Sequence, residues 1–178
     1  EDNELGENWA SSSQSYGEGD FGTPGSSNFP DDGFMVTVSD GWNLIGLPVM
    51  VEDPHYQSVF PSSVSGTLYG YNGVYTEEEN VMNGHGYWLR FSETENLFIA
   101  GQEISTLSIL LSEGWNLITG ISQEFSVEDI EDPEGIIILD TFYEFDGTYT
   151  NVSSLEPGKG CWVKANSSGT IGLTFSVY

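Results

Sequence analysis

Apolar and polar residues alternate in short stretches along the chain. Near residue 36, for example, Phe34, Val36 and Val38 alternate with Met35 and Thr37. A period of two is that of a β-strand with one buried face. Helical periodicity is absent from every stretch of ten or more residues, and Gly, Asn, Asp and Ser separate the alternating stretches. The pattern predicts an all-β protein with little helix.

The alternating stretches belong to a duplication. Three motifs recur at an offset of 73 or 74 residues (114 − 41 = 73; 143 − 69 = 74): "GWNLI" at 41–45 and 114–118, "YGYNGVYT" at 69–76 matching "YEFDGTYT" at 143–150, and "GHGYWLRF" at 84–91 matching "GKGCWVKA" at 158–165. Five or six short strands in each copy suit a small sandwich or barrel. We therefore predict two tandem homologous β-sandwich or barrel repeats, residues 34–104 and 105–178, closely associated because the connector between them is short.

Each repeat contains a hairpin motif. Asn72-Gly73 and Asp146-Gly147 lie between alternating stretches, and such dipeptides favour type I′ turns, which need positive φ at both central residues. The motif "GWNLI" is interpreted in the same structural way. Its Gly forms a turn, its Trp and Leu are buried by packing, and Asn43 and Asn116 bond to turn backbone.

Residues 1–33 belong to neither repeat. They are rich in Gly, Ser, Pro and acids, which is typical of a linker or an extended arm. Aromatic residues, among them Trp9 and Phe21, are spaced along this segment like anchors. An arm of this kind would dock on its own domain or on a neighbouring copy by strand addition.

The charge limits the class of partner. Three Lys and Arg face 28 Asp and Glu, a net charge of −25, which excludes nucleic acid and anionic membrane surfaces as partners. Solubility explains this acidity, and cation binding is the functional alternative. The acidic clusters at 77–79 and 128–134 match no EF-hand loop, so weak Ca²⁺ binding is left open and no other cofactor is expected.

With one Cys and no long apolar run, a disulfide framework and membrane insertion are excluded.

Catalytic motifs are absent from the sequence. The chain contains no Gly-x-Ser-x-Gly elbow, phosphate loop or His-Glu-x-x-His, and His55 and His85 lie in different contexts. Pairs of carboxylates suited to glycoside hydrolysis could exist, but no spacing separates them from surface charge. We predict that the protein is not an enzyme.

Two groups of residues are candidates for binding. The cations Arg90, Lys159 and Lys164 all lie in the same repeated motif, 84–91 and 158–165, so they either form local charge pairs or dock an acidic partner. Trp9 and Phe21 are further candidate partner contacts. Exposed aromatic rings are the second group, because such rings stack on sugars; the candidates are Tyr71, Tyr75 and Tyr149.

The doubled "GWNLI" and Gly-x-Gly-aromatic-Trp motifs resemble repeat modules near the C-termini of large secreted bacterial proteins, often ahead of a type IX secretion sorting domain. This resemblance covers about 145 residues (34–178). The stretch "NWASSSQSYGEGDFGTPGSSNF" is similar to the end of bacterial lamin-tail-like domains. Together these resemblances imply a surface or extracellular protein trimmed from a longer parent.

These observations favour a non-enzymatic extracellular or cell-surface β module with a structural or adhesive role. It would assemble with copies of itself, through the arm of residues 1–33, or with other surface proteins. The alternative is a carbohydrate-binding module that uses the exposed aromatic residues to bind glycans.

Overall fold

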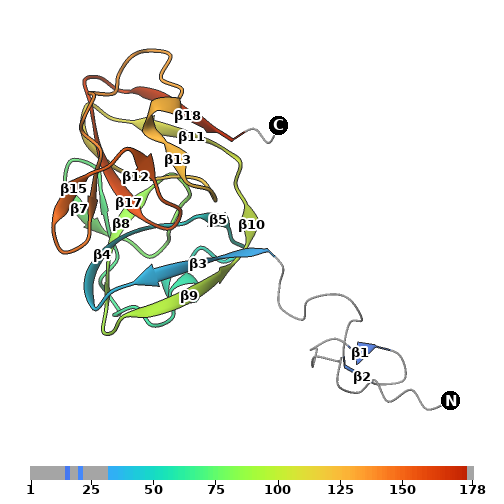
Figure 1. Cartoon of the computed structure of the whole chain (residues 1–178). Helices are drawn as coiled ribbons and strands as arrows, with labels where there is room; N and C mark the ends of the chain where they lie inside the picture. Colours follow the sequence, from blue (N-terminus) through green and yellow to red (C-terminus); the bar gives the residue numbers. More distant parts are fainter. Residues whose placement is uncertain (1–14, 17–19, 22–31, 176–178) are drawn as a thin grey trace. The chain divides into compact units, whose positions relative to one another are not determined.

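The computed structural model describes residues 15–16, 20–21 and 32–175 (Figure 1). The chain divides into two compact units, Glu1–Asp32 and Gly33–Tyr178. In the first unit the backbones of β1 (Ser15–Tyr16) and β2 (Asp20–Phe21) pair antiparallel. The second unit is built almost entirely from antiparallel strands in two similar groups, which confirms the predicted all-β class.

The strands of the second unit occur in a similar order in each half. The first half contains β3 (Gly33–Val38), β4 (Gly41–Gly46), β5 (Val49–Met50), the helical turn α1 (Tyr56–Val59), β6 (Tyr69–Tyr71), β7 (Tyr75–Glu77), β8 (Gly86–Phe91), β9 (Glu95–Ala100) and β10 (Gln102–Glu103). The second half contains β11 (Thr106–Leu111), β12 (Gly114–Thr119), β13 (Phe125–Ser126), the 3-10 turn η2 (Val127–Asp129), β14 (Tyr143–Phe145), β15 (Tyr149–Asn151), β16 (Ser154–Leu155), β17 (Gly160–Ala165) and β18 (Gly169–Thr174).

Both halves contain the same main sheets. A four-stranded sheet has the order β4-β8-β6-β7 in the first half and β12-β17-β14-β15 in the second. Two long strands also pair in each half, as β3–β9 and β11–β18. A third, two-stranded pair differs, because it joins β5 to β10 but β13 to β16. None of the described sheets closes into a barrel.

Each half has its own core between its two main sheets. In the first half, Val38, Phe60 and Phe91 belong to one buried cluster; in the second, Leu111 and Ile171 belong to another. Burial alternates along β3 as the sequence predicts, with Val36 and Val38 buried and Met35 exposed. In Figure 1, β3 and β9 lie at one end of the unit and β11 and β18 at the other, with β4, β8, β12 and β17 between them.

The halves meet through the outer faces of their four-stranded sheets. The Gly46 N–H donates to the Gly158 carbonyl (3.0 Å), and the Thr119 N–H donates to the Gly84 carbonyl (3.3 Å). These bonds are equivalent under exchange of the halves, since 119 − 46 = 73 and 158 − 84 = 74. The repeats are therefore related by a pseudo-twofold axis, and a third apolar cluster formed by Leu44, Leu117 and Trp162 fills their interface.

The glycines of the Gly-x-Gly motif allow this close approach. A Cβ on Gly86 would lie 2.7 Å from the Ile118 carbonyl oxygen, and a Cβ on Gly160 would lie 2.9 Å from that of Ile45. Real Cβ atoms do not come this near to backbone, so only glycine fits at both positions. The sequence predicts a turn here, whereas the structure shows that the motif also joins the two repeats.

The turn predictions are partly confirmed. Asn43 accepts from the Ser39 N–H (2.9 Å) and donates to the carbonyls of Ser39 and Gly41 (2.8 and 3.1 Å), and Asn116 makes the equivalent bonds. The type I′ assignment of the hairpins is wrong. Tyr71 pairs with Tyr75, which leaves a three-residue loop in which Gly73 alone has positive φ (75°).

Candidate aromatic ligand grooves

Strand alternation places the aromatic side chains of each repeat on one face of its four-stranded sheet. In β8, Tyr87, Leu89 and Phe91 point into the core, so Trp88 lies on the opposite face. In β4, Ile45 belongs to the core of the repeat, whereas Leu44 belongs to the interface cluster. The outer face of each sheet therefore carries the tryptophans, and the two outer faces are directed toward each other.

The tryptophans of the "GWNLI" motif are not packed in the cores. Trp42 is 45% exposed and Trp115 is 40% exposed. Each lies two residues before the leucine of its strand that enters the interface, so its ring stands at the rim of the contact between the repeats. The expected packing role is therefore wrong for Trp and correct for Leu44 and Leu117, which are buried between the repeats.

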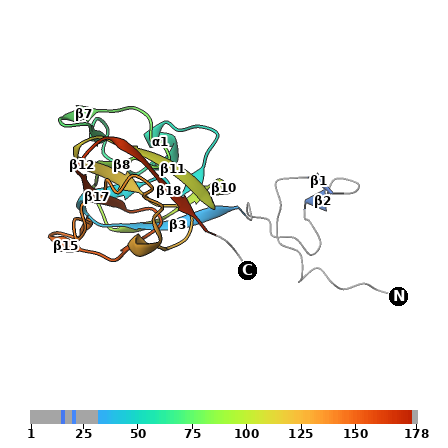
Figure 2. The ribbon, with the colours of Figure 1, turned by 90° about the horizontal axis from the view of Figure 1, so that it is seen from above.

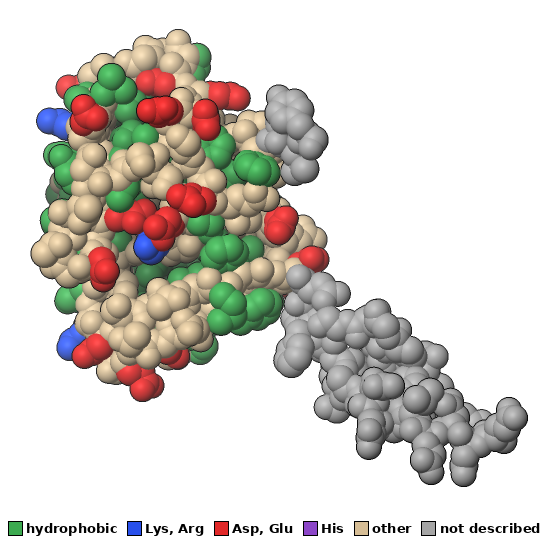
Figure 3. Space-filling model, in the orientation of Figure 1, with side chains coloured by type: hydrophobic (Ala, Val, Ile, Leu, Met, Phe, Trp, Pro, Cys, Tyr) green, Lys and Arg blue, Asp and Glu red, His purple; other side chains and the backbone are tan. Residues whose placement is uncertain are grey.

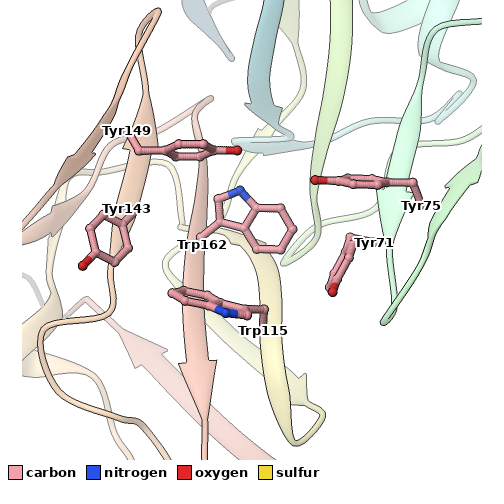
Figure 4. A pocket seen from close by; sticks show the side chains of 6 residues that line it. All are labelled: Tyr71, Tyr75, Trp115, Tyr143, Tyr149 and Trp162. Atoms are coloured by element: carbon pink, nitrogen blue, oxygen red, sulfur yellow. The ribbon is translucent and has the colours of Figure 1, made fainter.

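Six aromatic side chains from both repeats surround an open groove, called here the first groove, with a volume of about 480 Å³. Figure 4 shows Trp162 at its centre, Trp115 on one side, and Tyr75 and Tyr149 on the other, with their hydroxyls directed toward each other. The first groove is lined by Tyr71, Tyr75, Trp115, Tyr143, Tyr149 and Trp162. The structure thus brings together the three candidate stacking residues Tyr71, Tyr75 and Tyr149.

A second groove of about 570 Å³ is related to the first by the pseudo-twofold axis. All five of its residues correspond to first-groove residues at an offset of 73 or 74, and Tyr75 lines both grooves. The second groove is lined by Trp42, Tyr69, Tyr75, Trp88 and Phe145. The hairpins β6–β7 and β14–β15, which carry the tyrosines, extend on the same side of the unit in Figures 1 and 2.

Ring contacts between the repeats follow the same symmetry. Tyr71 contacts Trp162 at 4.8 Å between ring centroids, and its counterpart Phe145 contacts Trp88 at 4.9 Å. Both pairs are edge-to-face, at 79° and 71°, which is a favourable geometry for aromatic rings. Each groove therefore combines the tryptophans of one repeat with the hairpin aromatics of the other.

The centre of the first groove carries a polar atom without a partner. Trp162 is 8% exposed, and its indole Nε1 has no hydrogen-bond partner among the described residues. Figure 4 shows this nitrogen on the side of the ring that faces the Tyr149 hydroxyl. Burial raises the pKa of Tyr149, the neighbouring Tyr75 raises it further, and the contact with the Trp162 N–H opposes this shift.

A polar depression adjoins the first groove at Tyr71. It has a volume of about 530 Å³ and contains the carboxylates of Glu77, Glu78 and Glu79 and the amides of Asn72 and Asn80. Hydroxyl-bearing ligands on the aromatic rings would find hydrogen-bond acceptors here. Tyr87 also lines the depression, and burial raises its pKa to about 12.

The three cations have neighbours in their own repeats. Lys159 bonds to Glu156 and lies 3.8 Å from Glu144. The Lys164 ammonium lies 5.8 Å from the centre of the Trp115 ring, a cation–π contact. Exposed Arg90 is paired across the strands with Trp42 in the equivalent position. The structure thus places two of the cations beside the outer tryptophans of the grooves.

The remaining candidates for partner contact lie in the N-terminal unit. Trp9 is outside the described residues, and for Phe21 only the backbone in β2 is described. Their role as partner contacts stays a prediction.

Sequence reasoning missed seven residues of the grooves: Trp42, Tyr69, Trp88, Trp115, Tyr143, Phe145 and Trp162. A spacing of two along a strand is the signal that could have grouped them on one face. Trp42 and Trp115 precede the interface residues Leu44 and Leu117 by two positions. In the hairpins, Tyr69 lies two residues before Tyr71 in β6, and the two missed residues of β14 have the same spacing.

The described residues contain no group of three or more His, Cys, Asp or Glu that could hold a metal ion. In the same part of the chain, no helix is long and apolar enough to cross a membrane. Comparison with protein families, with curated proteins and with solved structures gave no match.

Proposed function

We propose that the protein is a non-enzymatic extracellular module that binds carbohydrate in its aromatic grooves and so has an adhesive role. The observation that carries this proposal is the pair of equivalent grooves, each surrounded by aromatic rings from both repeats. The extracellular location is supported by the acidic composition and by the resemblance to secreted repeat modules.

The chemistry of the rings suits a sugar. The C–H face of a pyranose ring is apolar and weakly positive, and it stacks on the electron-rich face of an aromatic ring. Tyr75 and Tyr149 are 54% and 55% exposed, so their rings are accessible to a ligand. Their hydroxyls and the carboxylates of the adjoining depression supply hydrogen-bond partners for sugar hydroxyls.

Self-assembly through residues 1–33 stays a prediction beside this proposal. The aromatic grooves lie in the second unit, so carbohydrate binding does not require the N-terminal unit. An adhesive module that also self-associates would present several groove pairs to one glycan surface, which would increase its avidity.

The proposal is tested by binding of the full chain to a panel of immobilised glycans at physiological salt. We expect binding, and we expect Trp115→Ala or Tyr149→Ala to weaken it roughly tenfold or more, since about 1.4 kcal/mol of lost stacking corresponds to tenfold. Phe98→Ala is the matched control, because Phe98 is 48% exposed but lines neither groove. Absence of binding across the panel would refute the proposal.

A further inference from the structure

Tyr75 lines both grooves, so the grooves meet at this ring. We infer that they form one continuous strip for a linear, neutral polysaccharide, with a stronger subsite at Trp115 and a weaker one at Trp42. This inference rests on the proposed carbohydrate binding and names the class of glycan and the order in which the subsites fill.

The aromatic rings form a connected series across the interface. On one side, Trp42 contacts Trp88 at 6.4 Å, and Trp88 contacts Phe145 at 4.9 Å between centroids. On the other, Trp115 contacts Trp162 at 6.3 Å. Tyr75 lies 6.5 Å from Trp162 while it also lines the second groove. A chain that leaves one groove at Tyr75 therefore enters the other.

The pseudo-twofold axis of the protein is compatible with the binding of a single polysaccharide across both grooves. A linear glycan that crosses the axis meets the same kinds of ring in reverse order in the second groove. Stacking uses the C–H faces of the sugars and depends little on chain direction, unlike a fixed set of hydrogen bonds. Because the platforms are aromatic, the reversal is tolerated.

Charge selects a neutral chain. The protein carries 28 acidic and 3 basic side chains, and acidic side chains are spread over the face shown in Figure 3. Lys159 is bonded to Glu156 and close to Glu144, which leaves Arg90 and Lys164, beside Trp42 and Trp115, against the three carboxylates of residues 77–79 in the adjoining depression. The acidic side chains would repel a polysaccharide of uronic acids or sulfated sugars. This repulsion acts within about 8 Å, the screening length at physiological salt.

The two subsites are unequal because two positions differ between the repeats. Tyr71 carries a hydroxyl, whereas its counterpart Phe145 in the second groove has none. Trp162 is nearly buried, whereas its counterpart Trp88 is half-buried. The first groove is lined by four tyrosines and the second by two, so a sugar in the first groove meets more hydroxyl groups. Short chains should therefore occupy the first groove.

The test uses an array of linear oligosaccharides that are neutral, contain uronic acids or are sulfated, each as a series of increasing length. Binding of the protein, residues 1–178, to this array is measured. We expect neutral chains to bind, with an affinity that rises about 100-fold between chains that fill one groove and chains that fill both. Trp115→Ala should abolish binding of short chains. Trp42→Ala should leave short chains unaffected and remove only the gain with length, and Phe98→Ala should change neither.

The outcomes separate this inference from the proposed function. Binding that is independent of chain length, a preference for acidic chains, or equal effects of Trp42→Ala and Trp115→Ala on short chains would overturn the inference and leave carbohydrate binding intact. No binding to any member of the array by the correctly folded chain would overturn both. Folding of each variant is checked by its thermal transition.

Discussion

Glu144 is a carboxylate with one buried oxygen that has no hydrogen-bond partner among the described residues. Burial raises its pKa, and the Lys159 ammonium opposes this shift. Burial lowers the pKa of Lys159, but Glu156 and Glu144 outweigh it, so that pKa is raised overall. The raised pKa of Glu144 means that folding favours its protonated form, so its contribution to stability is present at acid pH and is lost as pH rises through the folded pKa.

Gln cannot ionise, so Glu144→Gln avoids the loss of stability that ionisation of Glu144 causes. We expect Glu144→Gln to be more stable than the wild type at neutral pH, with a difference that shrinks as pH falls toward the ordinary range of a carboxyl group. The measurement is urea unfolding of both proteins over a series of pH values. Glu113→Gln is the control, because it removes the same charge from an exposed position. Equal gains from the two substitutions would show that general charge repulsion, not burial, is responsible.

Single residues were predictable where their role is local. Asn43 and Asn116 follow a glycine turn, and a side-chain amide two residues on is within reach of the turn backbone, so their bonds could be foreseen. The exposure of Trp42 and Trp115 could not be foreseen from the sequence. Whether a large ring on a strand is covered depends on how far the neighbouring repeat extends, which no local pattern contains.

At the scale of elements, the first glycine of the Gly-x-Gly motif has two roles: it adopts a positive φ, and it allows close contact between the repeats. Substitutions can separate these two roles. Gly158 and Gly147 have positive φ values of 83° and 75°, but their surroundings differ. A Cβ on Gly158 would lie 2.7 Å from Cγ2 of Val36 in the other repeat, whereas a Cβ on Gly147 would meet nothing within 4 Å. Both positions therefore carry backbone strain when substituted, and only Gly158 adds a clash at the interface.

Gly147→Ala should cost about 1 kcal/mol of unfolding free energy, the cost of placing a side chain in the left-handed region. Gly158→Ala should cost about 1–3 kcal/mol more, because the added methyl overpacks the interface. Denaturant unfolding of the two variants measures the difference. Equal losses would mean that Val36 moves aside and that the glycine is required for its backbone conformation alone.

The long strands and their order could be predicted from the sequence, because alternation marks β3 and β11 and the duplication doubles every inference. The short pairs could not. Two-residue strands such as β5 and β13 carry too little pattern to detect, and their partners differ between the halves although the main sheets agree. Loop geometry also escaped prediction, since the same Asn-Gly dipeptide suits both two-residue and three-residue hairpin loops.

At the scale of the whole molecule, the duplication was evident but the way the copies associate was not. The short connector predicts closeness, whereas the pseudo-twofold contact depends on which sheet faces meet. That choice follows from the outward-facing Leu and Trp of each four-stranded sheet, which remain apolar surface unless the other repeat covers them. The grooves form as a consequence, because the same faces continue past the edge of the interface.

This arrangement predicts that the two repeats unfold together. Leu117 is 4% exposed between the repeats, and Leu→Ala at such a site costs about 2–5 kcal/mol, which lowers the melting temperature by roughly 5–15 °C in a domain of this size. Calorimetry should show one transition for the wild type and one, at lower temperature, for Leu117→Ala. Leu139→Ala is the control, because Leu139 is 82% exposed and should shift the transition little. Two separate transitions, or a loss of amide protection in the second repeat alone, would show that the repeats are independent and that the interface contributes little to stability.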